Sequence, residues 1–351
     1  MNTIERVKAL SLATGINEDD LIGVIQKELG HTHALDEFIP YGNIHARAFA
    51  VSPILHIVAG NTPEAAIQSL TRGLLVGAHN FVKLPKNGLD GFDSFMMKLP
   101  SELVNLIETS SDREITDEWI NSTKVVIVFG SDETVFDVSQ KMTSTQTLIS
   151  HNHKISIAVV HSDPTQEAAG LAALDIHKFD QMGCLSPHCI YVDPKEKPRS
   201  FAARLARSLD SLNQKTVPNN RAVEVDARID HLRRSYEFRA SNDTSVQIWK
   251  SENNTNWTVV YEDEPQFAQS PLGQFVFVKP IPDDLKESLN FIIPSISTIA
   301  IHPYNLESAK SMASIGGTRF CPLGSSQTPS FYWHHDGYQS LAPLVTWQNA
   351  G

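Results

Sequence analysis

Short apolar runs alternate with helix-like stretches over much of the first half of the sequence, and this alternation restricts the fold more than any other feature. The run Ile54–Val58 is typical of a buried parallel strand, Pro63 is favourable as a first helical residue, and Asn80–Leu84 is a second strand-like run. A further buried-type run, Lys124–Phe129, precedes the helix-like stretch Asp132–Lys141. Strands that alternate with helices predict a parallel sheet covered by helices, so we expect an α/β fold.

Three residues with ligand-binding potential lie at the carboxyl ends of predicted strands. They are Asn61, Lys83 and Gly130. In open parallel sheets ligands bind at the carboxyl ends of the strands, so we expect these residues to border a binding site. The Gly-x-Gly-x-x-Gly loop that usually holds a dinucleotide occurs nowhere in the chain, so a dinucleotide would bind here without it.

The length of 351 residues is sufficient for two domains with separate hydrophobic cores. We expect N-terminal helices and a dinucleotide-binding domain over residues 1–150, a catalytic domain over residues 151–330, and a C-terminal segment over residues 331–351. A net charge of −11 argues against broad nucleic-acid binding, which requires a surface rich in Lys and Arg.

The start of the chain has no apolar signal region, and no run approaches the roughly 18 apolar residues that a membrane helix requires. Three cysteines, an odd and small number, indicate a reducing compartment rather than a disulfide framework. We therefore expect a cytoplasmic protein.

Cys184 lies where a helix-like run gives way to a strand-like run. Gly183 ends the first run, and Pro187 interrupts the backbone before the second. A cysteine at such a junction can project into a cleft, where backbone N–H groups lower its pKa and hold an oxyanion. Free cysteines also serve as small apolar core residues, and we interpret Cys189 and Cys321 in that way. For Cys184 we predict a role as nucleophile.

Three pairs of histidines suggest metal ligands: His31 and His33, His151 and His153, and His334 and His335. A metal site needs three or four convergent ligands, and no second cluster of matching spacing accompanies any pair. We therefore predict no metal site. The Gly-x-Ser-x-Gly motif of serine hydrolases is also absent.

Several short motifs occur in the order, and near the spacing, of the landmarks of the aldehyde dehydrogenase superfamily. They are Ala59–Pro63, Val82–Pro85, Phe129–Ser131 and Gln181–Cys184. Three further motifs narrow the match to one family within that superfamily: Gly183–Pro187, Gly316–Arg319 and His335–Gly337. Over roughly residues 45–347 the chain resembles the LuxC-like fatty-acyl-CoA reductases of bioluminescence. The resemblance implies a Rossmann-type cofactor domain and an α/β catalytic domain.

The resemblance also implies a mechanism. Cys184 would attack the carbonyl of an acyl thioester while the side-chain amide of Asn61 and the backbone N–H of Cys184 hold the oxyanion. Hydride from a reduced nicotinamide would then convert the acyl-enzyme to an aldehyde. Where hydrolytic members carry a glutamate that activates water, the alignment offers Ser150, so the acyl-enzyme should survive until hydride arrives. A shift of one or two residues would bring His151 or His153 nearer the thiol, and either could donate a proton.

The cofactor preference follows from two lysines. In the family Lys83 would contact the adenosine ribose, and Lys86 stands where members that prefer NAD often have a carboxylate. Two ammonium groups favour an added 2′-phosphate, so we predict NADPH; the alternative is that both are solvated loop lysines. Gly130 and Ser131 should approach the pyrophosphate at the next helix start, although the two acidic residues that follow them repel phosphate.

The predicted function is thus NADPH-dependent reduction of a fatty acyl-CoA or acyl-carrier thioester to an aldehyde. An acyl-phosphate reductase of the same fold and a non-catalytic docking module for an acyl carrier are the alternatives. An acyl-activating protein and a second copy of the chain are the protein partners that this prediction leaves open. We expect no nucleic-acid partner and no membrane span.

Overall fold

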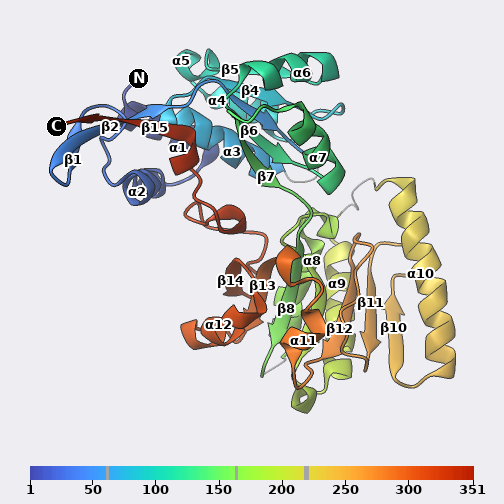
Figure 1. Cartoon of the computed structure of the whole chain (residues 1–351). Helices are drawn as coiled ribbons and strands as arrows, with labels where there is room; N and C mark the ends of the chain where they lie inside the picture. The colour runs from blue at the N-terminus through green and yellow to red at the C-terminus, as the bar shows by residue number, and fades with distance from the viewer. Residues whose placement is uncertain (61–62, 163–164, 217–220) are drawn as a thin grey trace. The chain divides into compact units, whose positions relative to one another are not determined.

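Residues 1–60, 63–162, 165–216 and 221–351 are described by a computed structural model, in which the chain divides into two units (Figure 1). Unit 1 comprises Met1–His153 and Ser330–Gly351, and unit 2 comprises Lys154–Pro329. Among the described residues, no helix combines the length and the apolar character that crossing a membrane requires.

Unit 1 contains a five-stranded parallel sheet in the order β5-β4-β3-β6-β7. Its strands are β3 (Ile54–Ile57), β4 (Asn80–Lys83), β5 (Ile107–Ser110), β6 (Val125–Phe129) and β7 (Thr147–His151). The chain moves outward from β3 to β5 and then returns to β6 on the other side of β3. The carboxyl ends of β3 and β6 therefore form the switch point at which open α/β sheets bind ligands.

Helices cover both faces of this sheet. They are α3 (Pro63–Val76), α4 (Phe92–Lys98), α5 (Ser101–Val104), α6 (Arg113–Ser122) and α7 (Asp132–Lys141), with α1 (Thr3–Thr14) and α2 (Glu18–Leu29) preceding the sheet. Ile54 and Ile127 belong to the core that α1 to α4 share, whereas Leu55 and Val126 belong to the core beside α6 and α7. Successive strand residues thus face opposite helical layers, as the unbroken apolar runs predicted.

Strand β5 was not predicted from the sequence. Its four residues include one apolar side chain, Ile107, and it lies at the edge of the sheet, where burial on both faces is not needed.

A second, antiparallel sheet of unit 1 joins the two ends of the chain. Its order is β1-β2-β15, formed by β1 (Ile39–Tyr41), β2 (Ile44–Ala50) and β15 (Val345–Ala350). The C-terminal segment thereby packs on the N-terminal part of the chain, and its residues can contribute to sites in unit 1.

Unit 2 contains a seven-stranded sheet in the order β10-β11-β12-β9-β8-β13-β14, in which β10 alone pairs antiparallel. The strands are β8 (Ile155–Val160), β9 (Pro187–Val192), β10 (Val246–Lys250), β11 (Thr258–Glu262), β12 (Phe275–Pro280), β13 (Ile296–His302) and β14 (Arg319–Pro322). The helices are α8 (Gln166–His177), α9 (Pro198–Asn213), α10 (Val223–Asn242), α11 (Leu285–Leu289) and α12 (Leu306–Met312). Helices α8 and α9 share the core on one face of the sheet, and α10 and α11 share the core on the other.

Candidate functional site

Cys184 lies in a tight turn between the 3-10 helix η1 (Lys178–Gln181) and the amino end of β9. The backbone N–H of Ser186 donates to the carbonyl of Gly183 at 3.0 Å and closes the turn. The Ser156 hydroxyl, on neighbouring strand β8, donates to the carbonyl of Cys184 at 2.8 Å. The structure confirms the sharp junction that the sequence predicted at this cysteine.

The segment before the turn has an unusual backbone. Phe179, Asp180 and Gln181 have φ angles of +55°, +54° and +61°, so three consecutive residues other than glycine are left-handed. This conformation costs on the order of 1 kcal/mol per residue and persists only where surrounding contacts hold it. The side chains around it must therefore supply that support.

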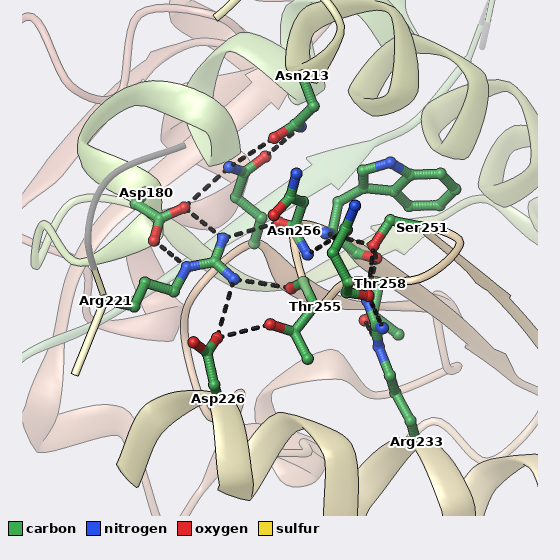
Figure 2. A network of polar contacts seen from close by, with 12 residues as sticks. Asp180, Asn213, Arg221, Asp226, Arg233, Ser251, Thr255, Asn256 and Thr258 are labelled. Carbon is green, nitrogen blue, oxygen red and sulfur yellow. Dashed lines mark hydrogen bonds and ion pairs between the residues drawn. The ribbon is translucent and has the colours of Figure 1, made fainter. Parts of the chain in front are cut away.

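Arg221 supplies much of this support (Figure 2). Its guanidinium forms a two-pronged ion pair with Asp180 and donates to the carbonyls of Thr255 at 2.7 Å and Asn256 at 2.8 Å. Gln274 donates a further hydrogen bond to Asp180 at 2.8 Å. The Arg221 and Asp180 side chains are 6% and 5% exposed, so their attraction is screened little by water or salt.

The glutamine at position 181 and the glycine at position 183 complete the frame of the turn. The Gln181 amide donates to the carbonyls of Pro187 at 3.0 Å and Phe275 at 3.1 Å. A Cβ atom at Gly183 would lie 2.8 Å from the side-chain oxygen of Gln327, which is too close for an ordinary contact. A side chain at position 183 would therefore displace the Gln327 amide, which donates to the Ser186 hydroxyl at 2.7 Å.

The three cysteines differ in access. Cys184 is partly exposed, whereas Cys189 and Cys321 are buried. Burial raises the pKa of Cys189 to about 12 and that of Cys321 to about 11. Both thiols are therefore protonated near neutral pH and are poor nucleophiles, which agrees with the interpretation of these two as core residues.

The predicted cofactor residues lie at the carboxyl edge of the sheet of unit 1. Lys83 ends β4 and is half-buried, and Lys86 is exposed in the following turn. Gly130 follows β6, and Ser131 caps α7 at its N-terminus. Asn61, the predicted oxyanion ligand, lies outside the described residues. The structure thus brings four predicted residues to one edge of one sheet.

The acidic start of α7 has a structural explanation. One carboxylate oxygen of Asp132 accepts hydrogen bonds from the Asn152 side chain at 2.8 Å and from the His153 backbone at 3.3 Å, so it anchors the segment that leaves β7. Gly130 approaches the Thr134 side chain so closely that a Cβ atom would lie 3.1 Å from it. A glycine directly before a helix start, beside a switch point, fits the phosphates of a dinucleotide.

His151 is held by contacts that sequence reasoning missed. Its Nδ1 lies 2.8 Å from a carboxylate oxygen of Asp336, and its ring stacks on Phe129 and His335 with centroids 4.5 and 3.8 Å away. A histidine oriented by a carboxylate is suited to proton transfer, whereas the His153 side chain is exposed. No sequence signal connects residue 151 with residues 335 and 336, because nearly the whole of unit 2 separates them.

The same cluster has the donors of a metal site. One ligand atom from each of His151, His335 and Asp336 lies within 4.8 Å of the others. The expectation of no metal site stays a prediction.

Comparison with known proteins gives matches to acyl-CoA and acyl-protein thioester reductases. The model of the acyl-CoA reductase (LuxC) family matches residues 2–347. The long-chain acyl-protein thioester reductase of Vibrio harveyi is 25% identical over 345 residues, covering 93% of this chain and 69% of that protein. Long-chain acyl-protein thioester reductase 2 of Photobacterium leiognathi is 23% identical over 341 residues, covering 93% and 70%.

Solved structures of aldehyde dehydrogenases have a similar fold. An NAD-dependent benzaldehyde dehydrogenase from Corynebacterium glutamicum gives a TM-score of 0.67 at 13% identity, covering 99% of this chain and 85% of that one. Lactaldehyde dehydrogenase from Escherichia coli gives a TM-score of 0.67 at 14% identity, covering 100% and 87%. At such identities the likeness concerns the fold alone.

Proposed function

Because the chain belongs to the acyl-CoA reductase (LuxC) family of oxidoreductases and has the aldehyde dehydrogenase fold, we propose that it reduces an acyl thioester to an aldehyde through Cys184. The observation that carries this proposal is a partly exposed cysteine in a turn whose strained approach is held by a buried ion pair. The named relatives act on long-chain acyl-protein thioesters, so a fatty acyl group on a carrier protein or on CoA is the substrate class.

In the proposed reaction the Cys184 thiolate attacks the thioester carbonyl, and its own backbone N–H and the Asn61 amide stabilise the oxyanion. The carbon–sulfur bond of the substrate breaks, the leaving thiolate takes a proton, and the acyl group remains on Cys184. A reduced nicotinamide supplies the hydride when it is bound. His151, oriented by Asp336, is the proton donor that the local geometry favours over His153.

Water must be kept from hydrolysing the acyl-enzyme. Ser150, which aligns with the water-activating glutamate of hydrolytic dehydrogenases, is a poor general base. We therefore propose that an acylated Cys184 persists until it is reduced.

NADPH is the proposed cofactor, held by Lys83 and Lys86 near its ribose phosphate and by Gly130 and Ser131 near its pyrophosphate. A Lys86→Glu variant should shift the cofactor preference toward NADH. A carboxylate accepts hydrogen bonds from the ribose hydroxyls and repels a 2′-phosphate. The matched control is Lys124→Glu, which makes the same charge change just before β6, at the opposite edge of the sheet. An unchanged ratio of kcat/KM for the two cofactors in Lys86→Glu would contradict the assignment.

The central test mixes purified protein with NADPH and a panel of acyl-CoA chain lengths. Cofactor absorbance reports turnover, and mass spectrometry reports acylation of Cys184. We expect Cys184→Ala to abolish both signals and Cys321→Ala, which removes a buried thiol, to retain them. Acylation without oxidation of NADPH would instead indicate a docking module, and activity confined to acyl phosphates would indicate the acyl-phosphate alternative.

A further inference from the structure

A small cavity, open in part to solvent, lies within unit 1. Its sheet side includes Ile127 of β6 and Ile149 and His151 of β7. Arg72 from α3 and His335, Gln339 and Leu344 from the C-terminal segment are among the residues that line its other sides. An apolar wall with a few polar groups is the usual pattern of a site for a small organic ligand.

Arg72 is the permanent cation of this cavity, and it has few partners. The residue is 8% exposed, its guanidinium stacks on the Phe331 ring 4.5 Å from the centroid, and its Nη2 donates to the Phe331 carbonyl at 3.3 Å. Its buried Nε has no acceptor within the described ranges. A guanidinium carries five N–H donors, and the Phe331 carbonyl accepts from one of them, so Arg72 retains donors for a further acceptor.

The charge of Arg72 is retained in spite of burial. Burial lowers its pKa to about 10, which leaves it protonated at neutral pH, and Glu28 acts on it by charge attraction. The carboxylate of Glu28 is already engaged, because it accepts hydrogen bonds from the backbone N–H groups of Ser340, Leu341 and Ala342. A buried charge without a bonded counter-ion is costly, so Arg72 needs an acceptor from elsewhere.

The described residues that line the cavity include no acidic side chain. The nearby carboxylate of Asp336 is hydrogen-bonded to the imidazole of His151 at 2.8 Å and lies 3.8 Å from that of His335. That carboxylate is therefore already engaged by the two histidines.

We propose that this cavity binds the carboxylate of a small organic acid, with Arg72 as its anchor and the aliphatic part of the acid against Ile127 and Ile149. A single guanidinium matches a single negative charge, and its planar donors suit the two oxygens of a carboxylate. The apolar wall favours an acid with a hydrocarbon tail over a bare dianion such as phosphate. The site shares His151 with the proposed reduction, but it would bind this ligand without requiring Cys184.

Titration calorimetry of the full chain at pH 8 with hexanoate, acetate and inorganic phosphate tests this site. We expect hexanoate to bind at one site per chain, more tightly than acetate, and phosphate to bind more weakly than hexanoate. Arg72→Gln should weaken hexanoate binding at least tenfold. The matched control is Arg47→Gln. Like Arg72, Arg47 has a buried Nε without an acceptor among the described residues, and its guanidinium stacks on an aromatic ring, that of Phe49. Arg47 does not line the cavity.

A second variant covers the case in which Arg72→Gln fails to fold. Gln339 is exposed and lines the cavity, so Gln339→Trp should fill the cavity while leaving the core intact, and should also weaken hexanoate binding at least tenfold. Equal hexanoate affinity in the parent chain and either folded variant would overturn the proposal, as would phosphate binding more tightly than either acid, or no carboxylate binding at all. These measurements involve no turnover, so they are separate from the fate of the proposed reduction.

Discussion

Replacing Asp180 by Asn would leave the buried Arg221 guanidinium with the more exposed carboxylate of Asp226, 3.6 Å from its Nη1, as its remaining counter-charge among the described residues. Removing one partner of a buried pair costs about 3–5 kcal/mol, and the asparagine oxygen can still accept one hydrogen bond, so we expect the lower end, about 3 kcal/mol. The pair also holds three left-handed residues, each costing on the order of 1 kcal/mol. Once the pair is lost, relaxation of this segment lowers the energy, so the turn that carries Cys184 should rearrange.

Two measurements follow from this argument. Urea unfolding monitored by circular dichroism should show the transition of unit 2 at lower denaturant, and the rate at which iodoacetamide alkylates Cys184 in the folded state should change. A variant that merely loses stability would shift the first measurement and leave the second unaltered. The double variant Asp180→Asn with Arg221→Gln, which removes both charges, should recover part of the stability because no unpaired charge remains buried.

The control is an exposed ion pair in the same unit. Glu307 and Lys310 are 81% and 61% exposed, so Glu307→Gln should cost no more than about 0.5 kcal/mol and should leave alkylation of Cys184 unchanged. If Asp180→Asn were as mild as Glu307→Gln in both measurements, the argument that the buried pair supports the cysteine turn would be refuted.

Two further predictions rest on pKa shifts. At pH 8 the pKa values of about 12 for Cys189 and about 11 for Cys321 leave roughly one thiol in 10⁴ and one in 10³ ionised. Iodoacetamide should therefore label Cys184 first in the folded chain. Peptide mapping that found a buried cysteine labelled first would contradict this. Burial lowers the pKa of His56 from 6.5 to about 4. Between these pH values the unfolded state binds a proton that the folded state does not. The free energy of unfolding therefore falls as the pH drops from about 6.5 to about 4. The expected loss of unfolding free energy over this range is about 3 kcal/mol. His56→Gln should remove that part of the pH dependence, as measured by urea titrations at a series of pH values. An unchanged dependence would show that another group is responsible.

Local pattern was sufficient for most of the fold. Buried strands such as Ile54–Ile57 and Val125–Phe129 are mostly apolar runs, and helix α7 has the predicted bounds, Asp132–Lys141. The edge strand β5 was missed because a polar strand of four residues has no such pattern. The α/β fold of the aldehyde dehydrogenase type, expected from ordered motifs, is confirmed by the solved structures of similar fold.

The sequence by itself determined the family, the parallel sheets, and the position of Cys184 at a helix–strand junction, because these depend on residues that are close together in the chain. The tertiary structure alone decided what supports that cysteine and what surrounds His151 and Arg72. Asp180 forms an ion pair with Arg221, His151 a hydrogen bond with Asp336, and Arg72 a hydrogen bond with the Phe331 carbonyl. Each of these partners is distant in the sequence. Such pairs form because the fold of each unit brings distant segments together. The buried environment that strengthens them exists only once the helices and strands have packed.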